Sequence, residues 1–182
     1  MSAVYGVAAC ALLVAAAACL CLRATGGEHR WWLPLAAFAL ALIPLSGETG
    51  IAVALHGALA APSFTLAQLA LLAILNRPMP AQSNPLLAGF VVLALGFYLF
   101  ALGFGPVDPY GFGYRSQLLP LALVPLAIWF WRRRLDGWLL ILAFDLAAYA
   151  SGLIPNFWDA LFDPVLFALA LYRLFRSGAR AA

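Results

Sequence analysis

The chain has 182 residues, of which 66% are hydrophobic and only 9% are charged. Ordinary soluble domains carry roughly 25% charged residues, so this composition excludes that class and predicts a polytopic helical membrane protein. The net charge of +3 is spread over several loops. This distribution favours a lipid bilayer as the partner and argues against binding to nucleic acid.

Apolar stretches separated by Pro, Gly, Asn and charged residues predict an all-α fold, a single bundle of about seven transmembrane helices over residues 1–182. The stretches lie near residues 3–22, 31–46, 49–75, 85–104, 117–131, 137–154 and 157–175. The third stretch contains Gly57 and Pro62, so it is either one kinked span or a re-entrant hairpin followed by a short helix. We expect one kinked span, because a hairpin would reverse the orientation of every later segment.

The basic residues predict the orientation of the bundle. All ten are arginines, and cytoplasmic loops of membrane proteins carry the excess of basic residues. With the N-terminus outside and the C-terminus cytoplasmic, nine arginines fall in inward-facing segments and only Arg115 falls outside. The sequence therefore predicts a multi-pass protein of a bacterial-type inner membrane in this orientation.

Three polar residues lie at depth within the predicted spans. At 1.5 Å per residue, His56 and Asp163 lie roughly 10 Å below the outer surface, and Asp145 lies roughly 13 Å below it. An ionised carboxylate at a helix centre costs on the order of 2.5–3.5 kcal/mol. Asp145 is therefore expected to face the bundle interior, to stay protonated or to have a partner. All three residues are candidates for a cavity or a proton path.

In the third span, a repeat of seven residues surrounds His56. Thr49, His56 and Ser63 recur at this interval, which places them on one face of a continuous helix. A lone histidine in a membrane helix is also a common hydrogen-bonding link between helices. The pattern thus predicts either part of a polar lining or an interhelical contact.

The sixth and seventh spans extend the predicted lining. Asp145, Tyr149 and Gly152 share a helix face, so the Tyr149 hydroxyl is expected to continue a hydrogen-bonded path outward from Asp145. Asp163 precedes Pro164, whose missing N–H would leave a backbone carbonyl one turn earlier unpaired. We expect that carbonyl and Asp163 to form a hydrated spot.

A second polar group is expected at the outer surface. Its members are charged residues at or beyond the outer ends of the predicted spans: Glu48, Asp108, Arg115 and Asp159. Between the fourth and fifth spans lies the Gly-, Pro- and aromatic-rich loop of residues 103–116, "GFGPVDPYGFGYRS". This loop is either a lid over the polar residues or a tight loop at the membrane interface.

In the fourth span, Gly89, Gly96 and Gly103 recur every seven residues. Small residues on one face allow a neighbouring backbone to approach closely. We therefore assign these glycines to helix packing.

Chemical motifs give little guidance to the function. The sequence contains no G-x-S-x-G, H-E-x-x-H or P-loop motif and no histidine pair suited to haem, so neither a cofactor nor a metal is expected. A metal site would need His56 together with carboxylates from other helices.

Three functions fit these residues. The first is a small transport or proton-conducting protein with an outward-facing polar cavity lined by His56, Asp145 and Asp163. The second is a non-catalytic subunit that assembles with other membrane subunits. The third is an enzyme acting on a lipid or polyprenyl substrate at the outer leaflet. Arg115 would hold a phosphate, and the acid–base groups would be Glu48, Asp159, Asp163 and His56. The sequence favours a non-enzymatic role and places transport first.

Overall fold

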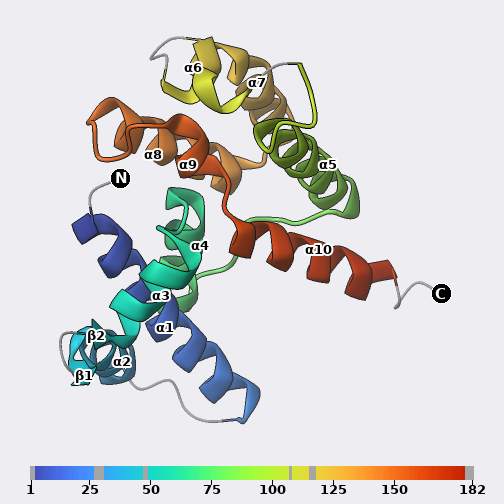
Figure 1. Ribbon diagram of the computed structural model, residues 1–182. Coiled ribbons are helices and arrows are strands. Elements are labelled where there is room, and N and C mark those ends of the chain that lie inside the picture. The colour runs from blue at the N-terminus through green and yellow to red at the C-terminus, as the bar shows by residue number, and fades with distance from the viewer. Residues whose placement is uncertain (1–2, 27–30, 47–48, 107, 115–117, 179–182) are drawn as a thin grey trace. The chain divides into compact units, whose positions relative to one another are not determined.

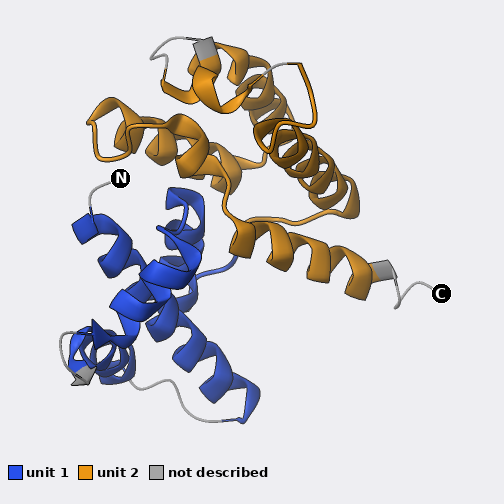
Figure 2. Ribbon diagram, viewed as in Figure 1, with its two compact units in different colours: residues 1–79 blue, residues 80–182 orange. Residues whose placement is uncertain are grey.

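In the computed structural model, the chain is described over residues 3–26, 31–46, 49–106, 108–114 and 118–178. This part of the chain is 76% helical, so the predicted all-α class is confirmed (Figure 1). The chain divides into two compact units, residues 1–79 and residues 80–182 (Figure 2).

The described residues of unit 1 form four helices and a short antiparallel ribbon. The first helix is one of the longest, and the others are short. The elements are α1 (Ala3–Ala24), α2 (Trp32–Leu42), β1 (Pro44–Ser46), β2 (Thr49–Gly50), α3 (Ile51–Leu59) and α4 (Phe64–Ile74). The ribbon, in which Pro44 pairs with Gly50, was not predicted from the sequence.

The stretch 49–75 is not the single kinked helix that we expected. α3 ends at Leu59, Ala60 adopts a left-handed backbone with φ of 60°, and α4 begins at Phe64. The Ser63 hydroxyl accepts a hydrogen bond from the backbone N–H of Leu66 at 3.1 Å and so caps α4. The chain turns between residues 59 and 64, so α3 and α4 are separate helices and each has its own direction.

Contacts with α1 show that α3 and α4 run in opposite directions along it. Ala52, near the start of α3, clusters with Cys10 and Ala11, whereas His56 lies against Gly6, closer to the start of α1. α3 therefore runs toward the N-terminus of α1.

For α4 the order of contacts with α1 is reversed. The Tyr5 hydroxyl donates to the carbonyl of Pro62, just before α4, at 3.1 Å. Ala70 and Ala73, near the end of α4, cluster with Ala16 of α1. α4 therefore runs in the same direction as α1.

The helix α2 is continued by α3 after the ribbon. Ala41, at the end of α2, belongs to the same cluster as Cys10, Ala11 and Ala52. Together α2, the ribbon and α3 thus run antiparallel to α1, from its C-terminal end to its N-terminal end. α4 then runs parallel to α1. Gly50 is needed at this junction, because a Cβ there would lie 2.9 Å from the carbonyl oxygen of Ile43 and 3.2 Å from that of Ala41.

The described residues of unit 2 contain six α-helices and one 3-10 helix. They are α5 (Asn84–Ala101), η1 (Tyr110–Tyr114), α6 (Leu118–Ala122), α7 (Val124–Arg132), α8 (Asp136–Ala150), α9 (Phe157–Leu161) and α10 (Pro164–Gly178). α5 packs on α10, α8 on α7 and α9, and η1 on α6 and α9. The stretches predicted as single spans near 117–131 and 157–175 are each divided into two helices.

Among the described helices, α1 and α5 are long and apolar enough to cross a membrane, judged by length and composition. Their environments differ. α1 buries seven residues against the rest of unit 1, whereas Ala94 is the one buried residue of α5. Val92 and Leu93 of α5 are 68% and 64% exposed, which is typical of a helix whose apolar surface meets lipid or another protein.

The glycines predicted to pack α5 do not do so within unit 2. A Cβ added to Gly89 or Gly96 would meet no described atom within 4 Å. Gly103 lies beyond the helix, where its φ of 88° ends α5 and its N–H donates to the carbonyl of Phe100. The expected seven-residue stripe therefore has two members on the helix, and both face open space.

Candidate functional site

The aromatic loop between α5 and α6 is fastened to the segment between α8 and α10. The Tyr110 hydroxyl donates to Asp159 of α9, at 3.0 Å from Oδ1 and 3.2 Å from Oδ2. The Tyr110 backbone N–H donates to Oδ1 of Asp108 at 2.9 Å. Two of the four predicted outer polar residues, Asp108 and Asp159, thus meet at one tyrosine.

Asn156 and Trp158 hold the same loop through its backbone. The side-chain amide of Asn156 donates to the carbonyl of Tyr110 at 3.2 Å, and Nε1 of Trp158 donates to the carbonyl of Pro109 at 2.8 Å. Asn156 also caps α9, since its Oδ1 accepts from the backbone N–H of Trp158. Gly113 is required here, because a Cβ would overlap the Asn156 side chain.

Aromatic rings support this attachment from the side of α5. The ring of Phe97 lies 4.7 Å from that of Trp158 and 5.7 Å from that of Phe162, between ring centroids. Trp158 and Phe162 also stack on each other at 5.5 Å. Such contacts each contribute about 0.5–1.5 kcal/mol beyond burial of area. The described part of the loop is therefore fastened to α9, and both expectations for the loop, a lid over polar residues and a tight loop at the membrane interface, stay predictions.

Burial raises the pKa values of Asp159 and Tyr110. It raises the pKa of the Asp159 carboxyl, although the hydrogen bond from Tyr110 lowers that pKa in part. It also raises the pKa of the Tyr110 hydroxyl, as do its hydrogen bond with Tyr114 and the charge of Asp159. Tyr110 therefore keeps its proton at neutral pH and acts as the donor to Asp159.

The two other outer polar residues, Glu48 and Arg115, lie outside the described residues. Glu48 falls in the sequence of unit 1, and Arg115 falls in that of unit 2. The structure therefore brings together Asp108 and Asp159, and the position of the other two residues of the predicted outer group is not described.

Asp163 has a structural role that differs from the expected hydrated spot. It is 5% exposed, and its Oδ1 accepts a hydrogen bond from the backbone N–H of Leu166 at 2.8 Å. Pro164 is the first residue of α10, where a missing N–H leaves no carbonyl unpaired. Asp163 is thus the N-cap of α10.

His56 lies in unit 1, and its expected helix face does not exist. Thr49 belongs to β2 and Ser63 caps α4, so neither shares a helix with His56. The imidazole of His56 lies on Gly6 of α1, where a Cβ would overlap the ring. Its Nδ1 is buried and has no hydrogen-bond partner among the described residues.

Asp145 lies inside α8, as expected, and is 1% exposed. Tyr149 follows one turn later, but Gly152 does not continue the helix face. α8 ends at Ala150, and Gly152 has a φ of 76° with its N–H donated to the carbonyl of Tyr149. Gly152 therefore terminates the helix.

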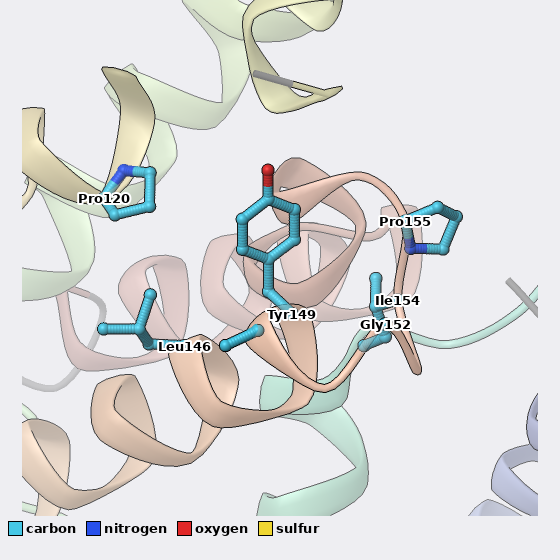
Figure 3. Close-up of a pocket in the computed structure, with 7 residues that line it drawn as sticks. Pro120, Leu146, Tyr149, Gly152, Ile154 and Pro155 are labelled. Carbon is cyan, nitrogen blue, oxygen red and sulfur yellow. The ribbon is translucent and has the colours of Figure 1, made fainter. Parts of the chain in front are cut away.

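An open pocket of about 480 Å³ lies beside Tyr149 (Figure 3). It is lined by residues of α6, of α8 and of the turn after α8: Pro120, Leu146, Tyr149, Ala150, Gly152, Ile154 and Pro155. In Figure 3 the Tyr149 hydroxyl points into the space between Pro120 and Pro155. The lining is mainly apolar, and of the residues expected to line a polar cavity Tyr149 alone borders this pocket.

The sequence analysis did not predict several features of the site: the roles of Tyr110, Asn156 and Trp158, and the pocket. The pattern "PNFWD" contains a recognisable signal for Asn156, because Asn is a preferred N-cap residue. The pairing of Tyr110 with Asp159 has no such signal. Comparison of the chain with protein-family models, with curated proteins and with solved structures found no match.

Proposed function

We propose that the chain is a multi-pass protein of a bacterial-type inner membrane that crosses the bilayer seven times. The spans are α1, α2 with α3, α4, α5, α6 with α7, α8, and α10, with the N-terminus outside and the C-terminus cytoplasmic. α9 and η1 then lie at the outer surface. Pairing α3 with α2 leaves the direction of every later span unchanged, so the assignment of the arginines remains as predicted. Position 48, which the sequence analysis placed at the outer surface, then falls between the two halves of the second span.

Two groups of contacts in unit 2 support this threading. At the proposed outer side, Trp158 and Asp159 contact Pro109 and Tyr110. At the proposed inner side, Nε1 of Trp138 donates to the carbonyl of Ala81 at 2.8 Å. Each group joins two segments for which the sequence predicts the same side of the membrane.

The positions of arginines in the helices agree with this threading. Arginines lie in the last turns of α1, α7 and α10, at Arg23, Arg132 and Arg176. All three helices run inward in this threading. Arginine at these positions satisfies the positive-inside rule and also interacts favourably with the helix dipole.

We further propose that the protein conducts protons or couples them to transport, with Asp145 as the protonatable group. The observation that carries this proposal is the burial of a carboxyl at 1% exposure in the apolar helix α8. Ionisable groups within membrane helices commonly mark ion or proton paths. Tyr149, one turn further outward, leads from Asp145 toward the open pocket.

Proton flux in proteoliposomes tests this function. We expect Asp145→Asn to abolish the flux and Asp145→Glu to retain part of it, because only the second variant keeps a titratable group. Asp136→Asn is the matched control, since Asp136 is an exposed acid in the first turn of the same helix. Unchanged flux in a well-folded Asp145→Asn protein would remove Asp145 from the mechanism.

A second candidate function is that of a subunit in a larger membrane complex. The observation in its favour is the exposed face of α5, on which Gly89 and Gly96 are open to a neighbouring helix. Purification in mild detergent followed by native mass spectrometry tests it. A single copy without partners, unaffected by Gly96→Leu, would count against it. The lipid-processing enzyme requires Glu48 and Arg115, which lie outside the described residues, and we do not propose it.

A further inference from the structure

The pocket beside Tyr149 has the size and walls of a ligand site. Its volume of about 480 Å³ falls within the range of roughly 300–1,000 Å³ that is typical of small-molecule pockets. Its side walls are formed by Pro120, Leu146, Ile154 and Pro155. These side chains offer apolar contact to a ligand and no hydrogen bond.

The polar side-chain group of the lining is the Tyr149 hydroxyl. No hydrogen bond of this hydroxyl is found among the described residues, and Figure 3 shows it directed into the pocket. A phenol hydroxyl readily donates a hydrogen bond. A ligand that fills the pocket therefore needs an acceptor at this point.

The site is preformed. The Tyr149 ring stacks on Phe157, with centroids 5.1 Å apart and an interplanar angle of 29°. The end of α8 is held by the N–H of Gly152, which donates to the Tyr149 carbonyl at 3.0 Å, and by the Ser151 hydroxyl, which donates to Ala148 at 2.9 Å. Little conformational entropy is therefore lost when a ligand binds.

The lining also selects the charge of the ligand. None of the seven lining residues is ionisable near neutral pH, so an ionised ligand would lose its hydration without gaining a charged partner. We infer that the pocket binds a neutral hydrocarbon chain that carries a carbonyl, such as an acyl ester, with the carbonyl oxygen accepting the Tyr149 hydroxyl. This inference rests on the geometry of the pocket, toward which the proposed proton path through Tyr149 also leads.

Photolabelling of the purified full-length chain tests the inference. The probe is the methyl ester of a diazirine-labelled palmitic acid, with unlabelled methyl palmitate as competitor and a diazirine-labelled alkane without carbonyl as the control probe. We expect saturable, competed labelling within residues 146–155 by the ester, and labelling by the alkane that is about three- to tenfold weaker because it forms no hydrogen bond. Equal labelling by both probes, or labelling of the exposed α5 surface alone, would overturn the inference.

Two variants separate the roles of shape and hydrogen bond. Ala150→Trp fills the pocket and should remove the saturable labelling, while Tyr149→Phe should weaken it about three- to tenfold through loss of one hydrogen bond. Tyr172→Phe changes an exposed tyrosine on α10 and should leave labelling unchanged. Unchanged labelling in Ala150→Trp or in Tyr149→Phe would contradict the assignment. If Ala150→Trp does not fold, Leu146→Trp provides the same block.

Discussion

The hydroxyl of Tyr110 donates to both carboxylate oxygens of Asp159, 49 residues further along the chain, at 3.0 and 3.2 Å. This bond joins η1 to α9, which α6, α7 and α8 separate in the sequence. Tyr110 is also held by Asn156 and Asp108, so three side chains fix the position of this one residue.

Removing this bond should loosen the loop. We expect Tyr110→Phe to lower the free energy of unfolding by about 1–2 kcal/mol, because the partly buried carboxyl loses its donor. Asp159→Asn should cost less, since its side-chain oxygen still accepts from Tyr110. Thermal unfolding of the purified protein measures both effects. Tyr172→Phe, at an exposed position, is the control. An equal loss of unfolding free energy in Tyr172→Phe would show that the loss in Tyr110→Phe does not come from the bond to Asp159.

The same pair predicts a pH dependence. Folding raises the pKa of Asp159 above its ordinary value near 3.9, so the folded state holds this proton more tightly than the unfolded state. The contribution to stability is full below about pH 4 and is lost as the pH rises through the raised pKa. Asp159→Asn should therefore reduce the decrease in the unfolding midpoint on going from pH 4 to pH 8. An identical pH profile in the variant would contradict this.

Asp163 should behave as a helix cap and not as a proton carrier. Asp163→Ala removes the acceptor for the backbone N–H of Leu166 and is expected to cost about 1 kcal/mol. Asp163→Asn keeps an acceptor at the N-cap and should lose little stability and no proton flux. Unfolding and flux measured on both variants check this, and loss of flux in a stable Asp163→Asn protein would restore Asp163 to the path.

The contact between Gly6 and His56 should limit substitution in unit 1. Gly6→Ala places a Cβ on the imidazole and is expected to destabilise the protein by about 1–3 kcal/mol through overpacking. His56→Ala in the same chain should recover much of this loss. Gly57→Ala is the matched control, because a Cβ at position 57 meets nothing within 4 Å. Equal destabilisation by Gly6→Ala and Gly57→Ala would exclude the contact between Gly6 and His56.

The sequence predicted the helical class and the positions of most helices, because long apolar runs bounded by Pro, Gly and charge are local signals. It also contained a signal for the cap at Asp163, since Asp followed by Pro is typical of a helix start. We read that proline as an interruption of a longer span. The division of α9 from α10 was therefore within reach of the sequence and was missed.

Other features depend on contacts between distant residues. Pro62 marked a break in residues 49–75, but the direction of α3 depends on its packing against Gly6 and Cys10 of α1. The expected face of Thr49, His56 and Ser63 was wrong because a seven-residue spacing has meaning only within one continuous helix. The bond between Tyr110 and Asp159 likewise arises from the tertiary fold.

The central claim is that α8 crosses the membrane with its N-terminal end inside and its C-terminal end outside. Labelling of one cysteine near each end of α8 tests it most directly. In a chain with Cys10, Cys19 and Cys21 replaced by alanine, single cysteines are introduced by Gln82→Cys, near the proposed inner contact, and by Ser151→Cys, near the outer one. Both positions are exposed. We predict that a membrane-impermeant maleimide labels position 151 in intact cells and position 82 only after permeabilisation. Labelling of both positions from the same side would contradict the account.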